Sequence, residues 1–396
     1  MSIFKHINNC NLFIGLYTAY MFIKASGANS LTGYLLLLIT IISLAYFGYV
    51  QFYMRQPRML KWLSILFYMF TIYGVLYILL GETVHDYNGP IRQIDYLKKI
   101  AASLLPVYPF YYFAKKGLFR LSYLNFWIPI FILVSIFSFA NYYSNMLEQA
   151  QANGVAATEF TNNTGYLFVS LLPLIFLRKG SSIINYIYIG VCALFIVMGV
   201  KRGAIAIGGL CITYYLVSNL QRNKGSKKLW FIFLSLIAVI IAGSYISDFI
   251  AKSSYFAYRL NNTLEGNMSG RDNIYSQMID VFLNSDLAAM IFGHGADSTI
   301  YFTTMLAHND WLELLVNQGI LGVIIYLCYF VAIYRTWYKY RKDHSIGICL
   351  SGLFIVLFLK TIFSMSYTEY SLFICMAYGY CMGYINILKT NRVNGR

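Results

Sequence analysis

Charged residues are scarce in this chain of 396 residues. Asp, Glu, Lys and Arg together make up 11% of it, and hydrophobic residues make up 59%. An ordinary soluble domain carries about 25% charged residues, so this composition excludes that class. The mean hydropathy of +0.60 instead indicates a polytopic membrane protein. Acids are scarcest, at 15 against 30 Lys and Arg, which gives a net charge of +15.

Several motifs of chemistry are also lacking. The sequence has no GxSxG, HExxH or P-loop motif, and no DxD-type carboxylate pair stands in an expected outer loop to hold a divalent ion. The seven cysteines all fall in expected spans, without CxxC spacing, so neither a disulfide framework nor a cysteine metal site is predicted. We therefore expect no metal and no cofactor.

The apolar runs predict an all-α protein with about twelve transmembrane helices, forming a single integral membrane domain over residues 1–396. The expected spans are 8–24, 31–54, 59–80, 97–114, 122–145, 165–177, 183–200, 203–218, 229–250, 310–334, 345–363 and 370–388.

Charge distribution then orients the chain. With both termini in the cytoplasm, the termini and inner loops hold 20 of the 30 Lys and Arg and one acid, Asp343. The positive-inside rule favours this orientation. Because topology accounts for the net charge, and no basic patch is interleaved with stacking aromatics, no nucleic-acid partner is expected.

Two outer loops are long, 146–164 and 251–309. In the second, Ser269 and Asp272 have capping-box spacing, and Ile274, Met278 and Val281 (with Phe282) follow on one face. The pattern predicts an amphipathic helix that lies on the outer membrane surface. Gly293-His294-Gly295 predicts a turn in the same large extracytoplasmic loop.

Four cations could bind an anion. Lys201 and Arg202 lie between two apolar runs at an expected outer end, and a shift of one crossing would instead make them cytoplasmic anchors. Arg271 follows Gly270 at a helix start, where free N–H groups favour anions, although a lone arginine there is more often solvated. Arg259 is a weaker candidate of the same kind.

A polar cluster lies at the start of the span 310–334, in the order His308, Asn309, Asp310 and Glu313. Ionisable groups at the end of a span indicate a site. His308 suits a general base, although an interfacial histidine is as often structural. Asp310 with Glu313 three residues later is more typical of an N-cap than of catalysis.

Four segments stand in order over about residues 160–330. They are Asn162-Asn163-Thr164-Gly165-Tyr166 before Pro173, Lys201-Arg202-Gly203-Ala204, Ser269-Gly270-Arg271, and the run from His308 to Gly322, HNDWLELLVNQGILG. Together these segments resemble the motifs of the O-antigen ligase/polymerase superfamily.

The resemblance implies a metal-independent membrane glycosyltransferase with a GT-C-like fold. It implies that Arg202 and Arg271 hold the donor pyrophosphate and that His308 activates or orients the acceptor hydroxyl, so these three are the expected catalytic residues. Lys201, Arg259, Asn309, Asn162 and Asn163 are the expected substrate-binding residues. Arg259 and Gly270 have the Arg-x10-Gly spacing described for some polymerases, but loop 146–164 contains no arginine, which departs from a two-loop arginine mechanism.

The motifs resemble polymerases of O-antigen, capsule or exopolysaccharide repeats more than ligases. The implied partners are undecaprenyl-pyrophosphate-linked glycans as donor and acceptor, the lipid bilayer and, as a further candidate, a chain-length regulator protein. The implied place is the bacterial inner membrane, with the site facing outward. Two alternatives stay open: an O-antigen ligase that transfers the glycan to lipid A-core, and a lipid-linked glycan flippase or transporter.

Overall fold

The computed structural model describes residues 8–394 except 83, 87, 88, 153–161, 181, 223–243, 245–270 and 304. The expected span 229–250, apart from Ser244, lies outside the described residues. So does the loop segment 251–270, which contains Arg259, Ser269 and Gly270. The chain divides into two compact units, and each is described by itself. Whether they form the expected single membrane domain stays a prediction.

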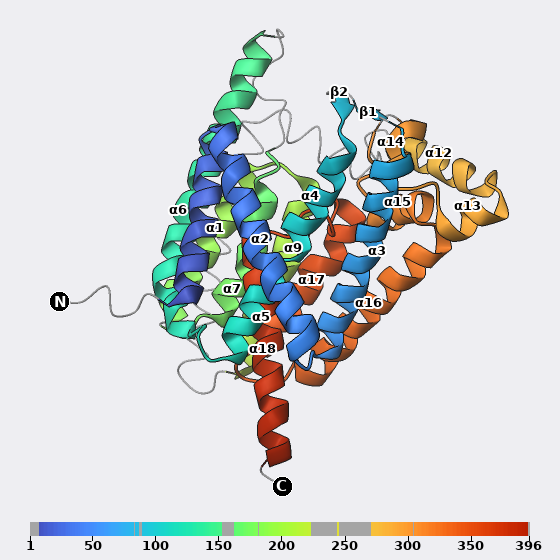
Figure 1. The fold of residues 1–396 in the computed structure, drawn as a ribbon. Helices are drawn as coiled ribbons and strands as arrows, with labels where there is room; N and C mark the ends of the chain where they lie inside the picture. The colour runs from blue at the N-terminus through green and yellow to red at the C-terminus, as the bar shows by residue number, and fades with distance from the viewer. Residues whose placement is uncertain are drawn as a thin grey trace. The chain divides into compact units, whose positions relative to one another are not determined.

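Unit 1 comprises Met1–Leu37, Leu118–Asn267 and Arg341–Val356. Its elements are α1 (Asn9–Ala25), the start of α2 (Asn29–Tyr53), the 3-10 helix η2 (Leu121–Tyr123), α6 (Leu124–Ala152), α7 (Gly165–Leu177), α8 (Ser182–Met198), α9 (Arg202–Arg222) and the first part of α17 (Gly347–Phe363) (Figure 1).

Helix α7 is the centre of unit 1, because it packs against α6, α8 and α9. It is apolar all round and almost entirely buried, as expected of a helix surrounded by other helices. The rings of Phe139, Phe168 and Phe195 meet where α6, α7 and α8 converge. Pro129 and Pro173 lie inside α6 and α7, as membrane helices tolerate when neighbours satisfy the freed backbone groups.

Unit 2 comprises Leu38–Gly117, Met268–Tyr340 and Leu357–Arg396. Its elements are the rest of α2, α3 (Arg58–Leu80), β1 (Val84–Asp86), β2 (Gly89–Ile91), α4 (Gln93–Leu104), α5 (Val107–Lys115), α12 (Arg271–Leu283), α13 (Leu287–Phe292), α14 (Ser298–Thr303), α15 (Asp310–Asn317), α16 (Gly319–Tyr340), the end of α17 and α18 (Leu372–Asn394) (Figure 1).

The core of unit 2 is the crossing of α5 and α18. A Cβ atom added at Gly379 would lie 2.6 Å from the Phe110 Cβ, and one added at Gly383 would lie 2.5 Å from the Ala114 Cβ. Glycine at both positions therefore lets the two backbones approach closely, a device common in membrane helices. Helix α3 packs against α4 and α16, and the short β1–β2 hairpin lies beside α14 (Figure 1).

Within the described residues, six helices are long and apolar enough to cross a membrane: 30–53, 58–80, 121–146, 202–221, 319–340 and 372–390. Shorter apolar helices cover 165–177, 183–198 and 347–363. These helices confirm the expected class, a helical protein with several membrane spans. The number twelve and the GT-C-like arrangement stay predictions.

Two expected spans are wrong as single helices. The span 97–114 consists of α4 and α5, because Pro106 cannot continue α4 and instead caps the start of α5. The span 310–334 consists of α15 and α16, which are separated at Gln318. Gly319 begins α16 with φ +65°, a left-handed conformation that ends the first helix and redirects the chain.

Candidate functional site

The structure brings two of the predicted motifs together in unit 1. The Asn162 backbone N–H donates to the Gly199 carbonyl oxygen at 2.8 Å, so the segment before α7 lies against the turn between α8 and α9. Gly165 lies beside Ala204 across the same junction. The Asn162–Tyr166 and Lys201–Ala204 segments therefore occupy the same end of the helices of unit 1.

Lys201 and Arg202 lie at the N-terminus of α9, and Arg202 is its first residue. Val200, just before them, has φ +51°, which makes the turn into α9 tight. Both side chains are partly exposed. A helix N-terminus presents unpaired N–H groups and a partial positive charge, and two cations add to it. This arrangement suits an anion.

The two predicted asparagines differ in their surroundings. Asn162 is buried, and its side chain donates to the Phe139 carbonyl oxygen and accepts from the Thr164 N–H, which fixes the entry into α7. Asn163 is exposed. Asn162 thus has a structural function within unit 1, and a substrate contact for either asparagine stays a prediction.

The polar cluster from His308 to Glu313 lies in unit 2, where Asn309 rather than Asp310 is the N-cap of α15. The Asn309 side-chain oxygen accepts from the backbone N–H groups of Trp311 and Leu312. The expected cap at Asp310 is therefore wrong by one residue. Asparagine is as good an N-cap as aspartate, and its use leaves the neighbouring carboxylate to point inward.

His308, directly before this cap, is exposed and has φ +53°. A residue other than glycine rarely adopts this left-handed conformation, and such outliers cluster at functional sites. The strain is retained because the residues on both sides are fixed: Asn309 caps α15, and Ala307 is held by Glu313.

The Glu313 carboxylate is completely buried and has a different function from the expected capping box. One oxygen accepts from the Ala307 N–H at 2.5 Å, and the other accepts from the Thr299 hydroxyl at 2.6 Å. The Asn317 amide also donates to it at 3.4 Å. Glu313 therefore connects α15 to α14 and to the loop segment that carries His308.

Asp310 is also completely buried. It accepts from the Tyr326 hydroxyl and, at 3.0 Å, from the Ser366 N–H. These contacts tie the start of α15 to α16 and to the segment after α17. We expected Asp310 to cap the helix. In the structure it instead links three segments of unit 2.

Three carboxyl groups around this segment have raised pKa values. Burial raises the pKa of Asp310 to about 8, although hydrogen bonds from Tyr326 and Ser366 oppose it. Burial raises the pKa of Glu313 to about 7 and that of Asp297 to about 6. All three lie in loops or in α15, which precedes the membrane-length helix α16. Asp297 and Asp310 each interact electrostatically with Glu313, and carboxyl groups with perturbed pKa values are typical of functional sites.

Arg271 is the first residue of α12, and its guanidinium donates to the Phe363 carbonyl oxygen at 3.3 Å. Trp311, in the histidine motif, donates through its indole to the Thr361 hydroxyl at 3.0 Å. Arg271 and the motif that follows His308 therefore contact the same end of α17. This brings together two of the predicted segments in unit 2.

The amphipathic helix expected in the large loop is confirmed as α12, but its apolar face packs against protein. Met278 is buried with Ala307 and Val316, and Ile274 and Val281 pack around them. The expectation that this face rests on the membrane surface is wrong for these residues. The apolar side chains of α12 pack against α15 and the segment that leads to His308, and this burial of apolar area stabilises that segment.

Sequence reasoning missed three partners of the carboxylates, Thr299, Asn317 and Tyr326. An amide at Asn317 within a largely apolar run was a signal, since polar residues there need partners. Lys360 is buried and pairs with Glu369 at 3.1 Å. In the described part of the chain, no three His, Cys, Asp or Glu residues are grouped closely enough to hold a metal ion.

The predicted residues thus fall in two groups. Asn162, Asn163, Lys201 and Arg202 belong to unit 1, and Arg271, His308 and Asn309 belong to unit 2.

Comparison with known proteins gives one family. Residues 187–327 match the family described as O-antigen ligase, and this stretch includes Lys201, Arg202, Arg271, His308 and Asn309. No curated protein matches the chain. The match confirms, over residues 187–327, the resemblance of this chain to the O-antigen ligase/polymerase superfamily.

Proposed function

We propose that this protein polymerises oligosaccharide repeat units carried on undecaprenyl pyrophosphate, at the outer face of the bacterial inner membrane. The product would be an O-antigen, capsule or exopolysaccharide. The observation that supports this most is the family match over 187–327, since it contains every residue to which we assign a catalytic function. Both termini would be cytoplasmic, and the chain would have about twelve spans in a GT-C-like arrangement.

The reaction we propose is a direct glycosyl transfer. The acceptor sugar's hydroxyl oxygen forms a bond to the anomeric carbon of the donor glycan. The bond from that carbon to the pyrophosphate oxygen breaks, and the lipid pyrophosphate leaves with the electron pair. The hydroxyl proton passes to the His308 imidazole. A histidine suits this step because its unperturbed pKa lies near neutral pH.

Negative charge develops on the leaving pyrophosphate, and we assign its neutralisation to arginine. Arg202 at the N-terminus of α9 and Arg271 at the N-terminus of α12 each combine a guanidinium with helix N–H groups. A planar guanidinium donates two parallel hydrogen bonds to a phosphate. Because this charge stabilisation needs no ion, we expect turnover without a divalent metal.

The further substrate contacts are assigned to Lys201, Asn163 and Asn309, whose side chains are at least partly exposed. Arg259 keeps its proposed function in the large loop, outside the described residues. Asn162 would act through the turn that it fixes before α7.

Transfer of the glycan to lipid A-core is the second candidate function, because the matched family is described as O-antigen ligase. Product analysis separates the two. A strain that lacks this protein should carry single repeats on lipid if the protein is a polymerase. It should accumulate long lipid-linked glycan and no glycan on lipid A-core if the protein is a ligase. If the protein moves lipid-linked glycan across the membrane and its loss impairs neither polymerisation nor ligation, the result would support a flippase.

A further inference from the structure

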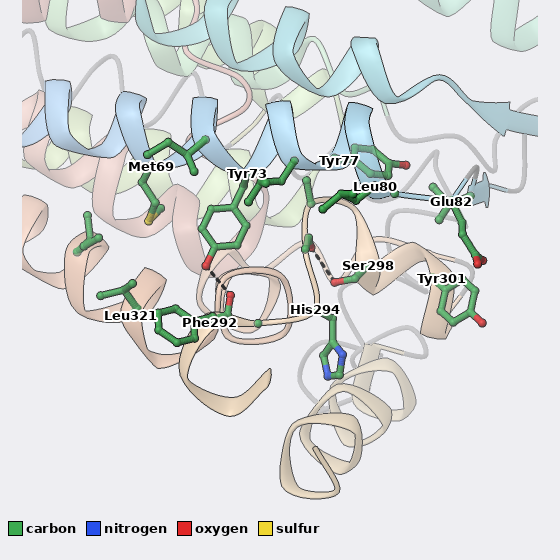
Figure 2. Close-up of a pocket in the computed structure, with 18 of the residues that line it drawn as sticks. Met69, Tyr73, Tyr77, Leu80, Glu82, Phe292, His294, Ser298, Tyr301 and Leu321 are labelled. Carbon is green, nitrogen blue, oxygen red and sulfur yellow. Dashed lines mark hydrogen bonds between the residues drawn. The ribbon is translucent and has the colours of Figure 1, made fainter. Parts of the chain in front are cut away.

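A groove lies on unit 2, and His308 is not among the residues that line it. It has a volume of about 1,000 Å³ and is lined by α3, the first turns of α16 and the segment 292–298 (Figure 2). This volume is at the upper end of the range of about 300–1,000 Å³ that is common for ligand pockets. Apolar side chains form most of its wall.

One wall of the groove follows a stripe of apolar side chains along α3. Along α3 its wall is formed by Ile65, Met69, Ile72, Leu76 and Leu80, which recur every three or four residues and so follow one stripe of the helix. Fifteen residues of helix rise by about 22 Å. Ile72 is 59% exposed and Leu80 is 81% exposed, on a helix long and apolar enough to span a bilayer. Hydrocarbon is the matching occupant of this stripe.

One end of the groove is polar, and it contains an unsatisfied group. Tyr77 is only 6% exposed, and its hydroxyl has no hydrogen-bond partner among the described residues. In Figure 2 this hydroxyl points toward the side where Glu82 lies. Tyr73, one turn earlier, donates to the Phe292 carbonyl oxygen. A buried hydroxyl left without a hydrogen bond is unfavourable, so the Tyr77 hydroxyl indicates a partner supplied by a ligand.

The charge at this end of the groove determines which polar group a ligand can place there. Glu82 lines the groove, and the described lining contains no lysine or arginine. Glu82 also forms no ion pair within the described part of the chain. An acid without a cation favours a ligand that carries a positive charge and hydrogen-bond donors. A pyrophosphate, with several negative charges, is disfavoured here.

We propose that this groove binds an aminophospholipid of the surrounding membrane. An acyl chain lies along the α3 stripe, the ammonium group contacts the Glu82 carboxylate, and a lipid oxygen accepts a hydrogen bond from the Tyr77 hydroxyl. The site is separate from the proposed glycosyl transfer and does not depend on it.

Lipid retention by the purified full-length protein tests this proposal. Native mass spectrometry would compare added phosphatidylethanolamine, phosphatidylglycerol and undecaprenyl phosphate. Phosphatidylethanolamine should be retained roughly tenfold better than phosphatidylglycerol, the change expected from one charge-assisted hydrogen bond of about 1.5 kcal/mol. Glu82→Gln should reduce this preference, and Tyr77→Phe should weaken retention while removing one oxygen atom.

A steric variant provides the matched comparison. Ile72→Trp would fill the groove and should abolish specific retention, whereas Ile183→Trp should not, because Ile183 is 61% exposed on α8 and lies outside the lining. Both positions are exposed, so both variants should fold. Equal retention of the two phospholipids, or retention unchanged by Ile72→Trp, would overturn the proposal. Preferential retention of undecaprenyl phosphate would overturn the aminophospholipid assignment. Glycosyl transfer is not measured, so its failure cannot be confused with these outcomes.

Discussion

The Glu313 carboxylate accepts a hydrogen bond from the backbone N–H of Ala307, the residue directly before His308. This contact, together with the Asn309 cap on the other side, holds His308 at φ +53° on an exposed segment. A buried acid thus fixes the conformation of the histidine to which we assign the proton transfer.

Replacing Glu313 with glutamine should be clearly harmful. Glu313 receives three donors, from Ala307, Thr299 and Asn317, and a glutamine must turn an NH₂ group toward one of them. One unsatisfied buried donor costs about 1–3 kcal/mol. We expect Glu313→Gln to lower the free energy of unfolding by that amount and to reduce turnover.

Thermal unfolding of the purified protein and polysaccharide chain length at matched expression measure the two effects. Glu148→Gln is the control, since Glu148 is exposed on α6. A Glu313→Gln protein as stable and active as the Glu148→Gln protein would support the capping function expected from the sequence.

Asp310 should make the protein less stable as pH rises. Its pKa is raised from 3.8 to about 8 by burial, so the folded state keeps a proton that the unfolded state loses. The unfolded state then binds fewer protons between pH 3.8 and about 8. Stability therefore falls across that window, by at most about 1.4 kcal/mol per pH unit for one group, and is flat above it.

Asp310→Asn imitates the protonated group and should flatten this dependence. Melting temperatures at pH 5, 6, 7 and 8 for wild type and variant measure it, with the smaller contribution of Glu313 remaining in both. A slope that is the same in both proteins would show that Asp310 is ionised in the folded state.

Gly293→Ala should disrupt the support of the α15–α16 junction. A Cβ at this position would lie 2.4 Å from the Asn317 carbonyl group, and φ is +77°. Backbone strain of this kind costs about 1–3 kcal/mol, and the overlap adds to it. We expect a lower melting temperature and a lower yield of monodisperse protein.

Gly190→Ala provides the comparison, because among the described residues no atom other than the nearby backbone of α8 itself lies within 4 Å of the position that its Cβ would occupy. Alanine is favoured over glycine within a helix by about 0.5–1 kcal/mol, so this variant should be at least as stable as wild type. Equal melting temperatures for the two variants would contradict the close contact at Gly293.

Arg202→Lys should impair turnover although the charge is kept. A lysine ammonium cannot make the two parallel hydrogen bonds that a guanidinium makes to a phosphate. Loss of one charge-assisted hydrogen bond of about 1.5–3 kcal/mol corresponds to roughly 10- to 150-fold in rate. Arg222→Lys at the other end of α9 is the control. Rates that fall equally in both variants, or in neither, would argue against a phosphate contact at Arg202.

Sequence reasoning located most helices because apolar length and charge asymmetry are local signals. The expected span 165–177 coincides with α7, whose bounds are Gly165 and Leu177. The breaks at Pro106 and Gly319 were missed because hydropathy continues across them. Backbone geometry, rather than composition, ends those helices.

The candidate residues were found by motif, whereas their contacts were not. The spacing of Asp310 and Glu313 suggested a cap because only neighbours along the chain can be compared in one sequence. Their partners Ser366 and Thr299 are 56 and 14 residues away, respectively. Which distant groups meet a buried carboxylate depends on packing, and no local pattern encodes it.

The His308→Asn variant tests most directly whether His308 takes a proton during glycosyl transfer. Asparagine tolerates the left-handed conformation observed at this position, so the backbone should be preserved while the imidazole is removed. The measurement is the chain-length distribution of surface polysaccharide in a strain that lacks this protein and is complemented with wild type or variant at matched expression. We predict a rate loss of roughly 10²–10⁴ and a shift to single repeats. Chains of wild-type length from the folded His308→Asn protein would contradict the account.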